Sequence, residues 1–303
     1  MTRITPRTAL LMTLPPLLWA GNAVVGRLAV GSVPPLTLNF LRWALATLLL
    51  LPLGWRALRQ PRAIAERWRH LLFIGLLGVS TYNAMQYLAL VTSTPINVTL
   101  IAASMPVWML AVGALFHGVH PTRRQFAGAA LSLAGVLLVI ARGDFAALAR
   151  VHFVAGDVYI VIAIIAWAFY SWQLAQPPAS MRAPARPDWN WAEFLLIQTT
   201  FGLLGAGAAA AGEVALGAAP VQWNGWVLAA LLYVAVGPSI IAYRCWGLGV
   251  TRGGPALAAF FGNLTPVFAA LMSAAVLGEA PQWFHAVAFA LIVAGIVVSS
   301  RRR

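Results

Sequence analysis

The chain has 303 residues, of which 61% are hydrophobic and 9% charged, and its mean hydropathy is +0.82. This composition excludes a water-soluble globular protein and indicates an integral membrane protein. Twenty basic residues, all arginine, outnumber seven acidic ones and give a formal net charge of +13. We interpret this excess as membrane topology and contact with anionic lipid, and we expect no nucleic-acid partner.

Apolar stretches long enough to cross a hydrocarbon core of about 30 Å recur along the chain. There are ten of them, at residues 9–30, 34–53, 71–91, 96–116, 126–141, 154–176, 192–212, 225–248, 254–278 and 282–300. Lipid offers no partner to an open strand edge, and the alternation typical of a β-barrel is absent. The sequence therefore predicts an all-α integral membrane protein with ten transmembrane helices.

The sequence also matches itself at a constant offset. Three prolines in the first copy reappear in the second, pairing Pro95 with Pro255, Pro106 with Pro266 and Pro121 with Pro281. We call this spacing the proline offset. Because each copy holds five spans, an odd number, the second copy enters the membrane from the opposite side. We predict two inverted five-helix repeats, residues 1–150 and 151–303, with a binding site near the midplane and alternating access.

The first span is expected to be retained, and not cleaved as a signal peptide. Its Trp19-Ala20 pair recurs as Trp167-Ala168, at a somewhat shorter spacing that we call the tryptophan offset. The difference between the two offsets is absorbed near residues 177–189, which are rich in Pro, Ala and Arg. We predict that this segment is a cytoplasmic linker.

The arginines predict the orientation in the membrane. With ten spans, both termini and fifteen arginines fall on one side: Arg3, Arg7, Arg56, Arg59, Arg62, Arg67, Arg69, Arg123, Arg124, Arg182, Arg186, Arg252, Arg301, Arg302 and Arg303. Only Arg142 and Arg150 lie in loops on the other side. By the positive-inside rule, both termini are expected to be cytoplasmic.

Several short motifs together resemble a known family. They are Trp19-Ala20-Gly21-Asn22 in the first span, Leu277-Gly278-Glu279 at the end of the ninth, and a proline in the middle of the fourth and ninth spans. With ten spans in two copies, the chain resembles the EamA-type drug/metabolite transporters, and most of all bacterial exporters of aromatic and other amino acids. One departure is that the first copy has Val119 where the second has Glu279. The resemblance implies a central cavity lined by spans one, three, four, six, eight and nine.

Polar and aromatic residues in those spans are candidate substrate contacts, because polar groups facing lipid would be costly. They are Trp19, Asn22, Tyr82, Asn83, Gln86, Trp167, Tyr170, Tyr243, Arg244, Trp246 and Asn263. Arg244 is the best candidate to hold a substrate carboxylate by bidentate hydrogen bonds. For each amide, a bond to a neighbouring helix is the alternative, and for each aromatic ring, a place in the interfacial belt. Arg244 could instead snorkel to the interface.

Missing residues constrain the energy source. The chain has no lysine, so it lacks a Walker A loop, and no acidic residue is expected at mid-membrane depth. This favours a facilitator or exchanger, although Glu279 or His285 near the outer face could couple protons. The sequence predicts a monomeric secondary exporter of neutral and aromatic amino acids in a bacterial inner membrane, without a cofactor. A proton-coupled exporter of drugs or cations is the alternative; an enzyme is not expected.

Overall fold

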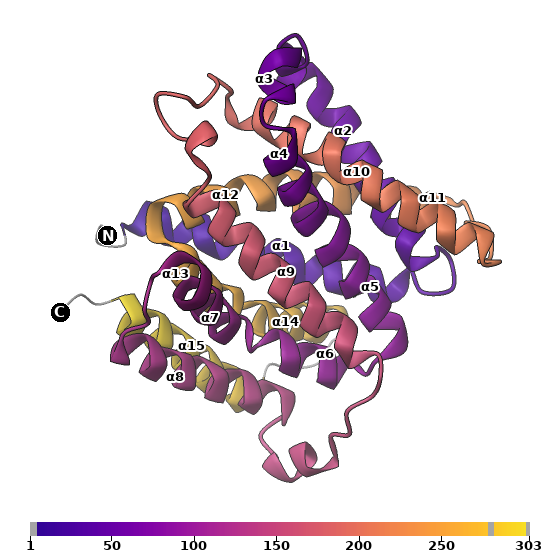
Figure 1. Ribbon diagram of the computed structural model, residues 1–303. Coiled ribbons are helices and arrows are strands. Elements are labelled where there is room, and N and C mark those ends of the chain that lie inside the picture. The colour runs from indigo at the N-terminus through magenta and orange to yellow at the C-terminus, as the bar shows by residue number, and fades with distance from the viewer. Residues whose placement is uncertain (1–4, 278–281, 301–303) are drawn as a thin grey trace.

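The computed structural model confirms an all-helical chain with ten spans. It describes residues 5–277 and 282–300. The ten candidate spans found there match the ten apolar stretches in order, and their ends shift by a few residues. Figure 1 shows the resulting bundle, in which the ends of the described chain lie on the same side.

The first repeat contains spans one to five. Its helices are α1 Pro6–Leu28, α2 Pro35–Leu58, α3 Pro61–Ala65, α4 Trp68–Gly75, η1 Leu76–Thr81, α5 Tyr82–Thr92, α6 Pro95–Ala102, α7 Met105–His117 and α8 Arg123–Ile140. A short 3-10 helix, η2 Phe145–Arg150, follows in the loop to the second repeat.

The second repeat contains spans six to ten. Its helices are α9 Asp157–Ala175, η3 Ala179–Met181, α10 Trp191–Ala215, α11 Gly225–Val234, η4 Ala235–Ile241, α12 Ala242–Gly253, α13 Pro255–Gly262, α14 Thr265–Leu277 and α15 Trp283–Ser300. Span three is the continuous run α4, η1 and α5, and span eight is α11, η4 and α12.

Both repeats are interrupted at the same places. The π-helices η1 and η4 occupy spans three and eight, and Gly78 in η1 corresponds to Pro238 in η4 at the proline offset. A π-helical turn breaks the regular backbone pairing, and such turns occur often at functional sites. Here each freed carbonyl accepts a side-chain hydrogen bond: Gly78 from Asn83 at 2.8 Å and Pro238 from Trp19 at 3.2 Å.

Spans four and nine are broken near their middles. A new helix begins at Met105 in span four and at Thr265 in span nine, each with a proline directly after that residue. Proline cannot donate the backbone hydrogen bond that a continuous helix requires, which explains both breaks. The sequence placed these two prolines at mid-span correctly.

Hydrogen bonds between equivalent positions mark the axis that relates the repeats. Asn83 Nδ2 lies 2.9 Å from the hydroxyl of Tyr243, its counterpart at the proline offset. Asn263 Nδ2 donates to the carbonyl of Ala103, again its counterpart at that offset, over 3.4 Å. Two positions exchanged by a twofold axis can touch only on that axis. The axis therefore passes through the middle of spans three, four, eight and nine.

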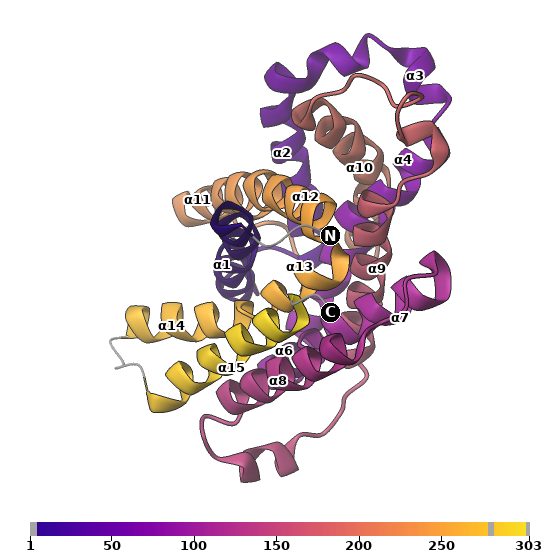
Figure 2. The same ribbon diagram turned by 90° about the vertical axis from the view of Figure 1, so that its left-hand side faces the viewer.

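Two peripheral helix pairs flank this centre, α2 with α10 and α8 with α15, and they lie at opposite edges of the bundle (Figure 2). The α8–α15 pair approaches closely at Gly128 and Gly295, where a Cβ on either glycine would lie within 2.7 Å of the other's carbonyl oxygen. Ala286 and Ala290 lie exposed on the opposite face of α15 and take no part in this contact.

The linker between spans six and seven is fixed to the first repeat. Arg67 donates to the carbonyls of Ser180 and Ala185 at 2.9 and 2.7 Å, and Trp189 Nε1 donates to Gln60 at 3.0 Å. We name the side of the bundle that holds these residues the linker end. The opposite side, with the loops at residues 29–34 and 141–156, is the far end.

The described carboxylates of the spans sit at helix ends, as the sequence predicted. Asp157 accepts hydrogen bonds from Asn97 and the backbone of Val154, and Glu193 completes a capping box with Asn190. Glu213 accepts from the backbone of Leu36 at 3.0 Å and of Thr37 at 2.7 Å. Glu279 lies outside the described residues.

We expect Glu213→Ala to destabilise the protein by about 1–2 kcal/mol, because it removes the anion that satisfies the first amides of α2. Thermal unfolding in detergent measures the loss. Asp188→Ala, at an exposed linker position, is the matched control and should leave the midpoint unchanged. Equal midpoints for the two variants would contradict this role for Glu213.

Candidate functional site

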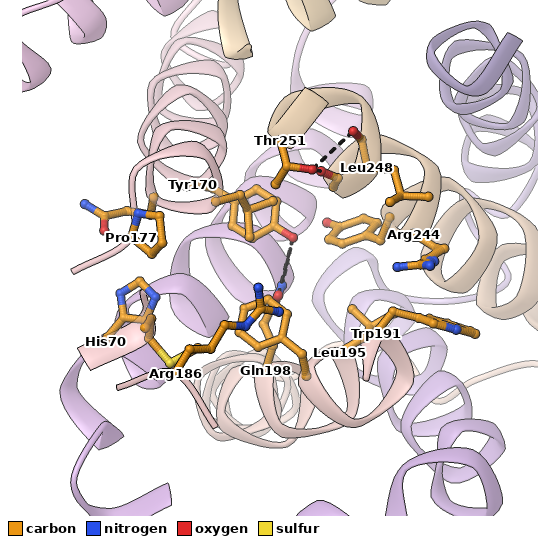
Figure 3. A pocket seen from close by; sticks show the side chains of 16 residues that line it. His70, Tyr170, Pro177, Arg186, Trp191, Leu195, Gln198, Arg244, Leu248 and Thr251 are labelled. Atoms are coloured by element: carbon orange, nitrogen blue, oxygen red, sulfur yellow. Dashed lines mark hydrogen bonds between the residues drawn. The ribbon is translucent and has the colours of Figure 1, made fainter. Parts of the chain in front are cut away.

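A cavity of about 280 Å³ opens at the linker end. It lies between α4, α9, the linker, α10 and α12 (Figure 3). Its lining residues are His70, Tyr170, Gln173, Leu174, Pro177, Met181, Arg186, Trp191, Phe194, Leu195, Gln198, Tyr243, Arg244, Gly247, Leu248 and Thr251. Arg186 and Thr251 at its rim are exposed, whereas Gln198 and Tyr243 are buried in its depth.

The charged side chains that line this cavity are all positive among the described residues. Arg186 and Arg244 contribute cations, and no Asp or Glu occurs among the described residues that line it. Arg244 lies over the ring of Trp191, 5.0 Å from its centroid. A site with this charge favours anions or the carboxylate end of a zwitterion.

Polar groups without charge meet at the depth of the cavity. Gln198 donates to the hydroxyl of Tyr170 at 3.0 Å, the contact drawn as a dashed line in Figure 3. Tyr243 approaches from α12 and bonds to the Gly78 carbonyl freed by η1. These groups place oxygen atoms where an ammonium or hydroxyl of a small molecule could bind.

Aromatic rings close the cavity toward the middle of the bundle. Trp167, fully buried, is the hub of this aromatic cluster. Its ring centroid lies 4.5 to 5.3 Å from those of Tyr82, Tyr170, Trp19, Tyr243 and Trp246. The Trp167 indole N–H has no hydrogen-bond partner within the described structure. The cluster therefore packs beneath the cavity, and the aromatic rings that line the cavity itself are those of Tyr170, Trp191, Phe194 and Tyr243.

Beyond this aromatic cluster, nearer the far end, lies Arg42, in the second turn of α2. Its side chain is fully buried. Nη1 donates to Tyr87 at 2.7 Å, Asn83 at 3.1 Å and Asn22 at 3.2 Å. Nε and Nη2 both donate to Ser239 Oγ in η4, at 3.0 and 2.8 Å. We call these five side chains the Arg42 cluster.

The family model of the EamA-like transporters matches the chain twice, over residues 6–141 and 154–301. The chain belongs to the EamA-like transporter family. It is therefore a multi-pass membrane transporter of small molecules and not an enzyme, and the two matches coincide with the two five-span repeats.

Curated relatives of this EamA-like transporter span nearly its whole length. An uncharacterised transporter of Archaeoglobus fulgidus is 28% identical over 98% of both chains. The aromatic amino acid exporter YddG of Ancylobacter novellus is 28% identical and covers 94% of this chain, which spans 93% of that protein. A solved crystal structure at 22% identity superposes with a TM-score of 0.75 over 97% of this chain and 96% of its own, which shows the shared fold.

The structure brings together nine of the eleven candidate residues of this EamA-like transporter. Three line the cavity: Tyr170, Tyr243 and Arg244. Four more belong to the aromatic cluster beneath it: Trp19, Tyr82, Trp167 and Trp246. Two belong to the Arg42 cluster: Asn22 and Asn83.

The other two candidates lie apart from these groups. Asn263 donates to Ser132 Oγ on α8 at 2.8 Å, the helix-to-helix bond that was the alternative for every amide. Gln86 is half-buried and is not among the cavity-lining residues. His285 accepts from the backbone of Gln282 at the start of α15. Substrate contact by these residues stays a prediction.

Most of the cavity-lining residues were not among the candidates, nor were Arg42, Tyr87 and Ser239 of the Arg42 cluster. Arg42 lies on α2, and its partner Ser239 belongs to the other repeat. Gln198 and His70 lie in the cavity wall, although His70 is the third residue of its helix and resembles an end residue. An arginine inside an apolar span is itself a signal, because a charge within the membrane is rare and usually functional.

Proposed function

We propose that this transporter exports neutral and aromatic amino acids across a bacterial inner membrane by alternating access. The observation that carries the proposal is the cavity, whose described lining has two arginines, no carboxylate and several aromatic rings. The name of the Ancylobacter novellus relative, an aromatic amino acid exporter, supports the same class.

An amino acid fits the chemistry of the cavity at three points. The Arg244 fork suits the α-carboxylate, because guanidinium binds carboxylates with two parallel hydrogen bonds. The hydroxyl of Tyr170 and the amide oxygen of Gln198 are acceptors for the α-ammonium. The rings of Tyr170, Phe194 and Tyr243, which line the cavity, suit an apolar side chain by stacking. The volume lies near the lower limit of about 300 Å³ for small-molecule pockets, which suits a single amino acid.

The direction of transport follows from the side on which the cavity opens. The linker end carries the arginine-rich loops, so the positive-inside rule makes it cytoplasmic. The structure would then be the inward-open state, in which substrate enters from the cytoplasm. Residues 1–150 and 151–303 would be the two units that rock about the axis through Asn83 and Tyr243, within one monomer.

The driving force we propose is the substrate gradient, either by facilitated export or by exchange. The described acidic residues of the spans are engaged at helix ends, and none lines the cavity. Export of cationic drugs, the alternative, would need an anionic group to balance the charge of the substrate, whereas this cavity presents arginine.

Purified protein in liposomes tests the proposal. We expect saturable uptake of labelled phenylalanine and leucine, stimulated by unlabelled amino acid inside and unchanged by an imposed pH gradient. Uptake that requires the gradient would overturn the facilitative mechanism. Uptake of tetraphenylphosphonium without any amino-acid uptake would overturn the substrate class in favour of cation efflux.

We expect Arg244→Gln to raise the half-saturating concentration of phenylalanine at the linker end by about tenfold, since one charge-assisted bond contributes about 1.5–3 kcal/mol. Uptake into vesicles whose linker end faces outward measures it. Arg252→Gln is the matched control, because Arg252 is exposed and lies outside the cavity lining. An unchanged value for Arg244→Gln would remove this residue from the carboxylate site.

A further inference from the structure

We propose that Arg42 is the carboxylate-binding residue of a second cavity, which opens toward the far end and is closed in this structure. The inference rests on the proposed function, because it deepens the same transport cycle. Three observations carry it: a buried cation without a counter-anion, its symmetry relation to the open cavity, and the group that now covers its binding edge.

The first observation is the unpaired charge of Arg42. All its recorded partners are neutral: two amides, a phenol and a serine hydroxyl. No carboxylate in the described part of the chain pairs with it. A buried cation is costly in a protein interior and more so in a membrane, so such residues usually serve a ligand or a charge partner. If this position had only to donate hydrogen bonds between helices, a neutral side chain would be sufficient.

The second observation is that the Arg42 cluster is the counterpart of the open cavity. Asn22 corresponds to Tyr170 at the tryptophan offset, and Asn83 corresponds to Tyr243 at the proline offset. Tyr87 corresponds to Gly247, also at the proline offset. Each of these second-repeat residues lines the open cavity.

Arg42 takes the place of Gln198 by its position in the helix, although their spacing matches neither offset. Each is the eighth residue of the second span of its repeat. Arg42 bonds to Asn22 as Gln198 bonds to Tyr170. The Arg42 cluster therefore contains the first-repeat copies of four cavity-lining residues. In an inverted repeat, those copies form the cavity of the opposite state.

The third observation is how the second cavity is closed. Ser239 belongs to the other repeat, and its hydroxyl oxygen accepts from Nε and Nη2 of Arg42 together. That edge of the guanidinium is one that binds a carboxylate through two parallel bonds. The Ser239 hydroxyl thus occupies the place of a carboxylate oxygen. When the repeats separate at the far end, this edge becomes free for the substrate.

The two cavities meet at the axis. Asn83 bonds to Arg42 on one side and to Tyr243, a wall of the open cavity, on the other. A substrate that leaves Arg244 therefore finds Arg42 beyond one layer of side chains. We infer that the carboxylate exchanges one arginine for the other during export.

The opening of the second cavity is tested with cysteine labelling in a Cys245→Ser background. Ala84 is buried and corresponds to Arg244 at the proline offset, so Ala84→Cys reports the second cavity. Thr251→Cys at the open rim is the control and should react with a membrane-impermeant maleimide in every variant. In lipid nanodiscs, the cysteine of Ala84→Cys should react slowly with the maleimide. Adding Arg42→Gln should accelerate this reaction about tenfold, because the closed state loses one charge-assisted hydrogen bond. A position 84 that stays unreactive in both backgrounds would overturn the second cavity.

The carboxylate assignment is tested by transport measured separately from each face. We expect Arg42→Gln to raise the half-saturating concentration of phenylalanine about tenfold at the far end, because the variant loses one charge-assisted hydrogen bond. The half-saturating concentration at the linker end should change less. Arg42→Lys keeps the charge and should retain preference for phenylalanine over its amide at that face, whereas Arg42→Gln should lose it. If the wild type transports phenylalanine and Arg42→Gln changes neither quantity, the inference is wrong while the proposed function stands. If the wild type transports no amino acid, the proposed function and the carboxylate assignment fail, and cysteine labelling still decides whether the second cavity exists.

Discussion

Replacing Gly247 with phenylalanine should abolish amino-acid flux without unfolding the protein. Gly247 lines the cavity, and a Cβ built on it meets no atom within 4 Å. A benzyl group there fills space that the substrate needs and clashes with little of the protein itself. We expect a loss of flux of about a hundredfold, because blocking a tight pocket removes most of the stacking and hydrogen bonding that a bound amino acid gains.

The matched control is Gly212→Phe, on α10. A Cβ at Gly212 also meets nothing within 4 Å, but this glycine is exposed and outside the cavity. Proteoliposome uptake and thermal unfolding measured on both variants separate plugging from misfolding. Normal flux through Gly247→Phe would show that substrate takes another route.

Trp167→Ala is the second large effect, and here we expect loss of stability together with loss of flux. Trp167 is fully buried and contacts five other rings, so truncation leaves a void in the middle of the bundle. Buried Trp→Ala changes cost about 3–5 kcal/mol. Trp167 also packs against Tyr170 and Tyr243 of the cavity wall, so its loss should disorder that wall and reduce flux.

Thermal unfolding in detergent measures the stability loss, and Trp223→Ala, at an exposed loop position, is the control. Trp167→Phe restores part of the volume and should recover most of the stability. A Trp167→Ala protein as stable as the wild type would show that the aromatic cluster contributes little to the fold.

The sequence was sufficient for the spans and the repeats, because apolar length and proline spacing are local properties. Pro106 and Pro266 even located the two helix breaks. Which face of a helix packs against its neighbours is not a local property of the sequence. Ala290 is exposed although it is apolar, because α8 packs against the other face of α15, where Gly295 lets it approach closely.

The types of residue in the candidate site could be predicted from the sequence, but which of these residues contact one another could not. Asn22, Asn83 and Asn263 look alike in sequence, yet Asn263 bonds Ser132 on a peripheral helix and the first two bond Arg42. The difference depends on contacts between residues that are far apart in the chain. The π-helices, which aim Ser239 at Arg42, likewise follow from packing across the repeats and have no distinct signal in the sequence.

The inequality of the two copies has a kinetic consequence. The two proposed carboxylate sites, Arg42 and Arg244, are not equivalent positions, since Arg244 corresponds to Ala84 at the proline offset, so the two faces of the carrier should bind the same solute with different strength. Without an energy source, net flux must vanish at equal concentrations, and the ratio of maximal rate to half-saturation must be the same in both directions. The face with the higher affinity therefore has the lower maximal rate. Such a carrier saturates early from one side while its flux still rises with concentration from the other.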